Sequence, residues 1–132
     1  MTVDALADTS VFVALESGRG TNLTDVTGEL RVSVVTLAEL EAGVLAAPDV
    51  ASRSQRLRTL EMASETAPLT ITAGVASEWA RLRVELRSAG RKAPVNDLWI
   101  AAIARANGLP VVTQDDDFDA LADLGLLTVI KV

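Results

Sequence analysis

Acidic residues in this chain recur where a short apolar stretch gives way to a helical pattern. Asp8 follows the stretch VDALA, Glu39 comes soon after RVSVV, and Asp115–Asp117 lie just beyond LPVVT. Asp97 opens the apolar helical segment LWIAAIA after Pro94. Carboxylate oxygens are the ligands that hard cations such as Mg²⁺ and Mn²⁺ prefer. If these acids meet in the fold, they can hold such a cation and support hydrolysis.

The order of the segments predicts that the acids do meet. Short apolar stretches alternate with helical periodicity, which is typical of an α/β sandwich around a mostly parallel sheet. In such sheets the carboxyl ends of the strands line one crevice, where ligands bind. Two carboxylates about 4 Å apart repel by roughly 4 kcal/mol at an effective dielectric of about 20. Several acids in that crevice therefore need a counter-ion, and Mg²⁺ or Mn²⁺ is the natural one.

Each acid also has a purely structural explanation, because acidic side chains stabilise helix N-termini. Asp8 is placed to cap a helix that begins at Thr9. The other structural explanations are Thr36 with Glu39 and Thr113 with Asp116 as capping boxes, and Asn96 as a cap with Asp97 in the first turn. Capping and metal binding are compatible, since one side chain can do both. The joint placement of the acids favours a common site.

Composition removes several other chemistries. The 132 residues include no Cys and no His, which excludes disulfides, thiolate metal sites, Ser–His–Asp catalysis and most zinc sites. The net charge of -6 argues against nonspecific wrapping of DNA. No apolar run is long enough to span a membrane and no secretory leader is visible, so we expect a cytoplasmic protein with no membrane attachment.

The elements that must position the acids fit one domain, residues 1–132. The predicted strands are residues 3–7, 31–35, 69–71, 109–113 and 126–132. The predicted helices are residues 9–17, 22–29, 36–46, 48–65, 73–89, 97–107 and about 116–124. Within 73–89, Trp79, Leu82 and Leu86 are the expected core contacts, and Gly90 closes the helix.

Four segments together resemble the PIN-domain family and, within it, the VapC-type toxins of type II toxin–antitoxin modules. The segments are ADTSVFVAL, VVTLAELEAGV, NDLWIAAIA and LPVVTQDDDFD, and they span nearly the whole chain. The resemblance implies a PIN-like, Rossmann-like three-layer α/β/α fold. It also implies Mg²⁺- or Mn²⁺-dependent hydrolysis of phosphodiester bonds by a metal-activated water. The expected substrate is structured cellular RNA of the tRNA or rRNA class, cut in single-stranded regions.

The resemblance also assigns residues and partners. Asp8, Glu39 and Asp97 match the three acids common to PIN nucleases, while Asp115 and Asp117 both fit the fourth position. We predict these five as catalytic, metal-holding residues and leave the number of metal ions open. Asp116 is assigned as a surface or capping residue. A cognate VapB-like antitoxin and a second copy of the chain in a homodimer are the expected protein partners.

Some roles remain open at this stage. Arg83, Arg87 and Arg91 are spaced i, i+4, i+8 and share one helix face, which is either solvated or follows RNA phosphates near the site. Thr9, Ser10 and Thr113 are near enough in sequence to orient water or substrate. The rival function is a non-catalytic PIN-like module that binds RNA or protein, although the presence of every expected acid favours the nuclease.

Overall fold

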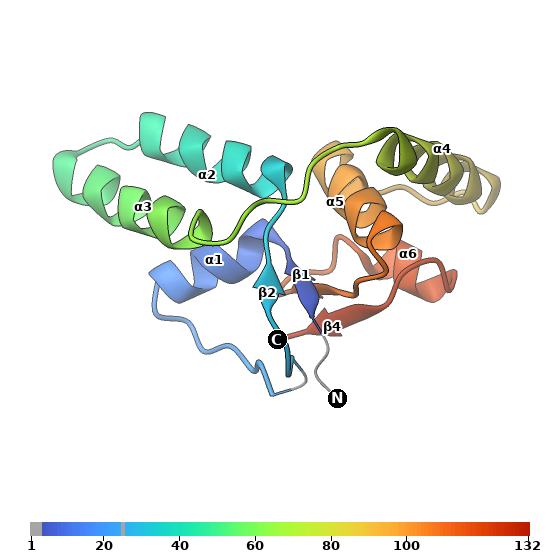
Figure 1. Ribbon diagram of the computed structural model, residues 1–132, viewed down its shortest axis with the longest axis horizontal. Helices are drawn as coiled ribbons and strands as arrows, with labels where there is room; N and C mark the ends of the chain where they lie inside the picture. The colour runs from blue at the N-terminus through green and yellow to red at the C-terminus, as the bar shows by residue number, and fades with distance from the viewer. Residues whose placement is uncertain (1–3, 25) are drawn as a thin grey trace.

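A computed structural model describes residues 4–24 and 26–132, and its centre is a parallel sheet (Figure 1). The strands are β1 (Ala5–Ala7), β2 (Leu30–Arg31), β3 (Val111–Thr113) and β4 (Val129–Lys131). Their order in the sheet is β2-β1-β3-β4, and all three pairings are parallel. Leu6 pairs with Val111 and Val112 with Ile130, so β1 and β3 are central. The carboxyl ends of these two strands therefore open on the same edge of the sheet.

Helices cover both faces of the sheet, as the predicted three-layer α/β/α fold requires (Figure 1). They are α1 (Thr9–Glu16), α2 (Val34–Leu45), α3 (Val50–Ala63), α4 (Ala73–Ser88), α5 (Val95–Ala106) and α6 (Asp119–Asp123). Side chains alternate along β1: Leu6 joins the core formed with α4, α5 and α6, whereas Ala5 and Ala7 join the core formed with α1, α2 and α3. Each face of the sheet thus has its own apolar core.

The α5 helix is the most buried of the helices that flank the sheet. Its residues Ile100–Ala104 are entirely buried, which explains why this segment reads as continuously apolar. Leu82 and Leu86 of α4 pack into the same core, as predicted, and the Trp79 ring stacks on Trp99 of α5 with centroids 5.0 Å apart. Because α5 is held on several sides, its first turn has a fixed position relative to the sheet.

The predicted helix at residues 22–29 is wrong for the described part of that segment. Residues 22–24 and 26–29 form turns and irregular structure. The Asn22 side chain accepts hydrogen bonds from the Thr24 backbone N–H (3.2 Å) and hydroxyl (2.7 Å), a local pattern that competes with a helix. Leu23 and Val26 still pack against the core beneath α1 to α3. The spacing of these apolar residues results from this packing and not from one face of a helix.

Strand boundaries also differ from the predictions. The strand expected at 31–35 is Leu30–Arg31, because Ser33 turns the chain and caps α2 by accepting from the Thr36 N–H at 3.1 Å. The strand expected at 69–71 is reduced to a single parallel bridge between Leu69 and Ser33. The strand expected at 126–132 is limited to β4. In the part of the chain that the structure describes, no helix is long and apolar enough to cross a membrane.

Candidate active site

Asp8 stands at the point where β1 ends and α1 begins, at the carboxyl edge of the sheet. Its side chain caps α1, accepting from the Ser10 N–H at 3.4 Å, which confirms the predicted capping role. The residue is only 3% exposed. Pairing of β1 with β3 places it beside Thr113, whose hydroxyl donates to Asp8 Oδ2 at 3.0 Å. Asp8 is therefore a buried carboxylate that the two central strands hold in place.

The Thr113 hydroxyl links several groups at this edge. Thr113 is fully buried at the end of β3, and its Oγ1 lies 3.2 Å from Asp115 Oδ1 and 3.1 Å from Ser10 Oγ. One hydroxyl proton serves one acceptor at a time, so Asp8 and Asp115 share this donor. The Asp117 N–H also donates to Asp115 Oδ1, at 3.2 Å. These contacts fold the 113–117 segment toward Asp8.

Glu39 reaches the same region from α2. The Thr9 hydroxyl donates to Glu39 Oε1 at 2.8 Å and lies 3.0 Å from the Thr36 hydroxyl. The predicted capping box of Thr36 with Glu39 is wrong, because Ser33 is the N-cap of α2. The Glu39 carboxylate therefore accepts a hydrogen bond from Thr9 of α1, the residue after Asp8, and among the described residues it accepts none from its own helix start.

Asp97 lies in the first turn of α5, partly buried. Burial, which is the largest cause, acts together with the charges of Asp8, Asp117 and Asp115 and a hydrogen bond to Asp117 to raise the pKa of its carboxyl to about 8. Asn96 does not cap this helix; the N-cap position is Pro94, which has no side-chain hydrogen bond. The prediction of Asn96 as a cap is therefore wrong, whereas Asp97 does occupy the first turn.

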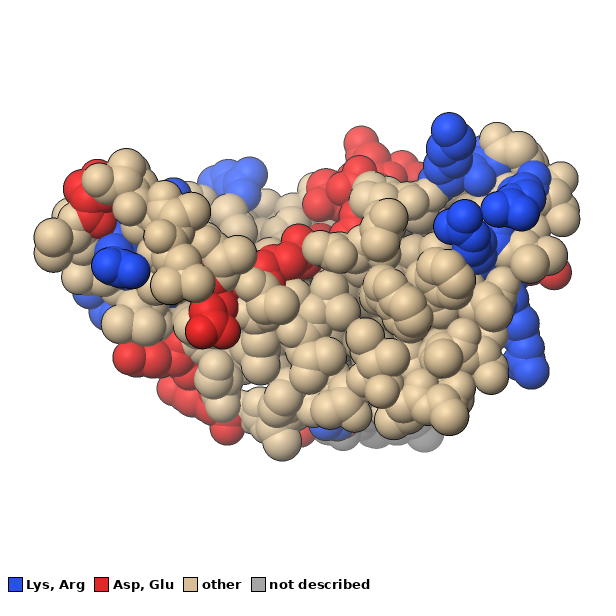
Figure 2. Space-filling view, turned by 90° about the horizontal axis from the view of Figure 1, so that it is seen from above, with Lys and Arg blue, Asp and Glu red and all other residues tan. Residues whose placement is uncertain are grey.

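Asp8 responds to the same surroundings. Burial raises the pKa of its carboxyl, the hydrogen bonds from Ser10 and Thr113 lower it, and the charge of Asp115 raises it. The structure thus brings Asp8, Asp97, Asp115 and Asp117 into one electrostatic neighbourhood, with Glu39 tied to it through Thr9. Figure 2 shows acidic side chains in the hollow between the half of the molecule that carries α2 and α3 and the half that carries α4.

Asp116 behaves differently from its neighbours. Its side chain is 87% exposed and forms an ion pair with Lys131, which also lies 3.0 Å from Asp119. The predicted capping box of Thr113 with Asp116 is wrong, because α6 begins only at Asp119 and the Thr113 hydroxyl is bonded to other acids. Of the two predicted roles of Asp116, surface or capping, the structure therefore supports the surface.

The clustered acids fit a divalent metal in their chemistry. In residues 4–24 and 26–132, none of the five predicted site acids forms a salt bridge with a Lys or Arg. All their donor atoms are carboxyl oxygens, which suit Mg²⁺ or Mn²⁺. The same described residues contain no group of three or more acids arranged so that it could already hold an ion. Mg²⁺ commonly keeps several waters and takes one or two carboxylates, so the cluster needs no complete protein cage.

Three hydroxyl residues of the site were predicted only as possible orienters of water or substrate. In the structure Thr9 donates to Glu39, Ser10 bonds to Thr113, and the Thr113 hydroxyl contacts Asp8 and Asp115, while the predicted orienting role stays a prediction. Their adjacency to the acids in the sequence was the available signal. Which acid each hydroxyl contacts depends on strand pairing and helix position, which the sequence pattern does not specify.

Comparison with known proteins identifies the family of this chain. The family model described as the PIN domain matches residues 5–124. Ribonuclease VapC5 of Mycobacterium tuberculosis is 48% identical over 125 residues, covering 95% of this chain and 93% of the relative. Ribonuclease VapC4 of the same organism is 43% identical over 125 residues, covering 95% of this chain and 96% of that protein.

Solved structures of toxin–antitoxin proteins have a similar fold. A crystal structure of VapBC-5, a member of the VapBC family of toxin–antitoxin systems from M. tuberculosis, matches with a TM-score of 0.90 and 43% identity, covering 98% of this chain and 99% of that chain. VapBC2 from Rickettsia felis has the same fold, with a TM-score of 0.81 at 23% identity over 98% of both chains. The chain therefore belongs to the PIN-domain family and, within it, to the VapC-type ribonuclease toxins of toxin–antitoxin modules.

Proposed function

We propose that this chain is a Mg²⁺- or Mn²⁺-dependent endoribonuclease that hydrolyses phosphodiester bonds in structured cellular RNA of the tRNA or rRNA class. The observation that carries the proposal is the gathering of Asp8, Asp97, Asp115 and Asp117, none of which forms a salt bridge among the described residues. Burial of Asp97, together with the charges of the other three acids, raises the pKa of its carboxyl to about 8. A fold that accepts such repulsion retains a site for a cation. The relatives named ribonucleases support RNA as the substrate, and the RNA class follows from the family resemblance alone.

The residues of the chain have distinct parts in this proposal. Asp8 is fixed by the Ser10 N–H and the Thr113 hydroxyl, and Glu39 is fixed by the Thr9 hydroxyl. These bonds orient carboxylate oxygens from rigid elements toward one crevice, as metal ligands require. Asp97, Asp115 and Asp117 complete the anionic surroundings. A bound Mg²⁺ or Mn²⁺ would supply the Lewis acidity that activates a water and offsets charge on the phosphoryl oxygens.

The products of the reaction test this chemistry. Cleavage through the RNA 2′-hydroxyl usually relies on a general acid and base such as His, and the chain has no His. We therefore expect 5′-phosphate and 3′-hydroxyl ends, together with loss of activity in EDTA and recovery with Mg²⁺ or Mn²⁺. Mass spectrometry of the fragments distinguishes these ends from a cyclic phosphate. Cyclic phosphate ends, or cleavage in excess EDTA, would contradict the mechanism, and RNA binding with no cleavage at all would favour the non-catalytic module.

The proposed biological role is that of a cytoplasmic toxin held inactive by a VapB-like antitoxin, with the chain forming a homodimer. The structural relatives described as VapBC systems support an antitoxin partner. The exposed apolar residues Leu45 (69%) and Val50 (82%), at the facing ends of α2 and α3, support contact with another chain. Sequencing of RNA 5′ ends after brief induction in cells identifies the target. Unchanged growth on expression of metal-loaded wild-type protein in its native host would contradict the toxin role.

A further inference from the structure

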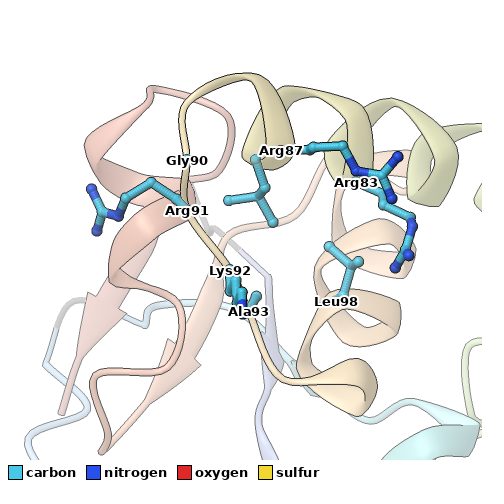
Figure 3. Close-up of a pocket in the computed structure, with 8 residues that line it drawn as sticks. Arg83, Arg87, Gly90, Arg91, Lys92, Ala93 and Leu98 are labelled. Atoms are coloured by element: carbon cyan, nitrogen blue, oxygen red, sulfur yellow. The ribbon is translucent and has the colours of Figure 1, made fainter.

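A second concave site lies beside the first turn of α5, next to the basic C-terminal half of α4. It is a pocket of about 390 Å³ between the C-terminal half of α4, the connection at 90–93 and α5 (Figure 3). Its lining residues are Arg83, Leu86, Arg87, Gly90, Arg91, Lys92, Ala93 and Leu98. We call this site the arginine pocket. None of its lining residues belongs to the acidic cluster.

The charge of the arginine pocket is entirely positive. Four of its lining residues are Arg or Lys and none is acidic, in a chain whose net charge is -6. Among the residues that the structure describes, Arg87 and Lys92 form no ion pair. Arg91 lies 3.1 Å from the exposed carboxylate of Asp123, and the Arg83 guanidinium lies 5.4 Å from the centre of the Trp79 ring. Unpaired cations gathered around one hollow attract an anion.

The base of the pocket is apolar. Leu86 and Leu98 are 3% and 4% exposed, and Ala93 packs against the same core. Figure 3 places Leu98 below the helix that carries Arg83 and Arg87. A free phosphate ion would use only the cationic rim, whereas a nucleotide also presents a flat, largely apolar base. The combination of guanidinium groups, which bind phosphate bidentately, with buried aliphatic side chains therefore favours a nucleotide.

The pocket adjoins the acidic cluster. Leu98 lines the pocket, and the preceding residue on the same turn of α5, Asp97, belongs to the cluster. Figure 2 shows Lys and Arg side chains at the α4 end of the face on which the acidic hollow opens. A strand of RNA with one phosphodiester at the acids can thus continue along this face toward the pocket.

We infer that the arginine pocket binds one nucleotide of the RNA substrate next to the cleaved bond, with its phosphate on the guanidinium groups and its base against Leu86 and Leu98. This inference rests on the proposed ribonuclease function, since it assigns the pocket to the same substrate. An acidic segment of a protein partner is the competing occupant, and the test separates the two.

The test compares two charge reversals of equal size. Arg87→Glu with Lys92→Glu alters the pocket, and Arg53→Glu with Arg58→Glu on the exposed surface of α3 is the matched control. The probe is a short fluorescent single-stranded RNA, with binding followed by anisotropy in EDTA so that no cleavage occurs. Loss of two phosphate contacts lowers the slope of log affinity against log salt by about 1.4. We expect this change, with about a tenfold or greater loss of affinity at low salt, in the pocket variant only.

Tryptophan emission gives a local readout. The two Trp residues of the chain, Trp79 and Trp99, stack on each other, and Trp79 lies against Arg83 of the pocket. RNA binding should change their emission in the wild type and the α3 control and not in the pocket variant. The neutral pair Arg87→Gln with Lys92→Gln provides an intermediate effect, and circular dichroism confirms that each variant folds.

Several outcomes overturn the inference. They are wild-type RNA affinity in the pocket variant, an equal loss in the α3 control, or a loss restricted to binding of a poly-glutamate peptide, which would assign the pocket to an acidic partner. A cleavage assay with Mn²⁺ separates this inference from the proposed function. A wild type that binds RNA through the pocket and never cleaves it contradicts the ribonuclease and supports the pocket. A pocket variant that binds and cleaves as the wild type does contradicts the pocket alone.

Discussion

Two groups of acids in this molecule differ in their partners. Asp116 and Asp123 lie on the surface, with side chains 87% and 61% exposed, and each is paired with a Lys or Arg. Glu78 is similarly bonded to Arg105 at 2.9 Å. Asp8 and Asp97, by contrast, are buried or partly buried, and no cation of the described residues pairs with them. We call these the paired acids and the unpaired acids.

The difference shows that the fold, in the part of the chain that the structure describes, leaves acids without a cationic partner at the carboxyl edge of the sheet. The chain has 12 basic residues, so cations are available, and several line a pocket that adjoins the unpaired acids. None of them is directed at Asp8 or Asp97; hydroxyl groups and backbone N–H groups serve Asp8 instead. Repulsion among buried acids lowers stability, and proteins retain such a cost mainly at functional sites. The unpaired acids are therefore expected to control activity, and the paired acids to have only small effects.

The largest expected effect is loss of cleavage on neutralising an unpaired acid. Asp8→Asn or Asp97→Asn should retain the fold and lose RNA cleavage by about 100-fold or more, because an amide is a poorer ligand for a hard cation and removes a charge from the site. Circular dichroism and a cleavage assay with Mn²⁺ measure the two properties. Full activity in both variants would show that the unpaired acids are not the catalytic site.

A metal ion should convert the unpaired acids from a cost to a source of stability. Addition of Mg²⁺ or Mn²⁺ should raise the Tm of the wild type. The free energy of unfolding should increase by about 2.7 kcal/mol when the ion is at about 100 times its Kd. The Asp97→Asn variant should show a smaller rise, because one ligand or neighbouring charge is missing. Ca²⁺-free and EDTA-treated samples are the reference. Equal Tm shifts in both proteins would show that the ion does not bind at the acids named here.

The third effect concerns pH in the absence of metal. Asp97 has a pKa of about 8 in the folded chain, against 3.8 for the unperturbed group. Between these values the folded state binds more protons than the unfolded state, so the free energy of unfolding falls as pH rises through this window. Asp97→Asn should therefore be more stable than the wild type at pH 8 in EDTA, by about 1–2 kcal/mol after allowance for solvent screening.

Urea denaturation at pH 5 and pH 8 measures this difference. At pH 5 the Asp97 carboxyl is protonated in the folded wild type, so the two proteins should differ little there. A wild type that is as stable as the variant at both pH values, or more stable at pH 8, would mean that Asp97 is not crowded by other acids in solution.

Sequence reasoning predicted which acids lie together at this edge of the sheet more securely than it predicted their hydrogen bonds. The periodicity of Ala73–Ser88 and of Val95–Ala106 was strong enough to predict α4 and α5, because each has a long apolar face. The placement of Asp8 and Asp97 at helix starts followed from the same patterns. The capping boxes involving Glu39 and Asp116 were wrong, since a local spacing of three residues does not show that Thr9 and Lys131 bind these side chains instead.

Short elements were the hardest to predict for a related reason. Residues 22–24 and 26–29 have apolar spacing that fits a helix, but Leu23 and Val26 owe it to packing against the core formed with α1, α2 and α3. Strand β2 is two residues long because Ser33 begins the capping of α2. Tertiary contacts determine such boundaries, and a single sequence carries little information about them.

The smallest expected effect is also the sharpest test of the distinction between the two groups of acids. Asp115 and Asp116 are neighbours in sequence, and Asp→Asn makes the same chemical change at both. Asp115 shares the Thr113 hydroxyl with Asp8 and raises the pKa of Asp97, so Asp115→Asn should reduce cleavage clearly. Asp116→Asn removes one exposed ion pair, and Lys131 keeps Asp119 at 3.0 Å, so stability should change by less than about 0.5 kcal/mol and cleavage by less than about twofold. Parallel cleavage assays and thermal melts of the two variants decide the matter. If Asp116→Asn lost as much activity as Asp115→Asn, pairing with a cation would not mark an acid as structural in this fold.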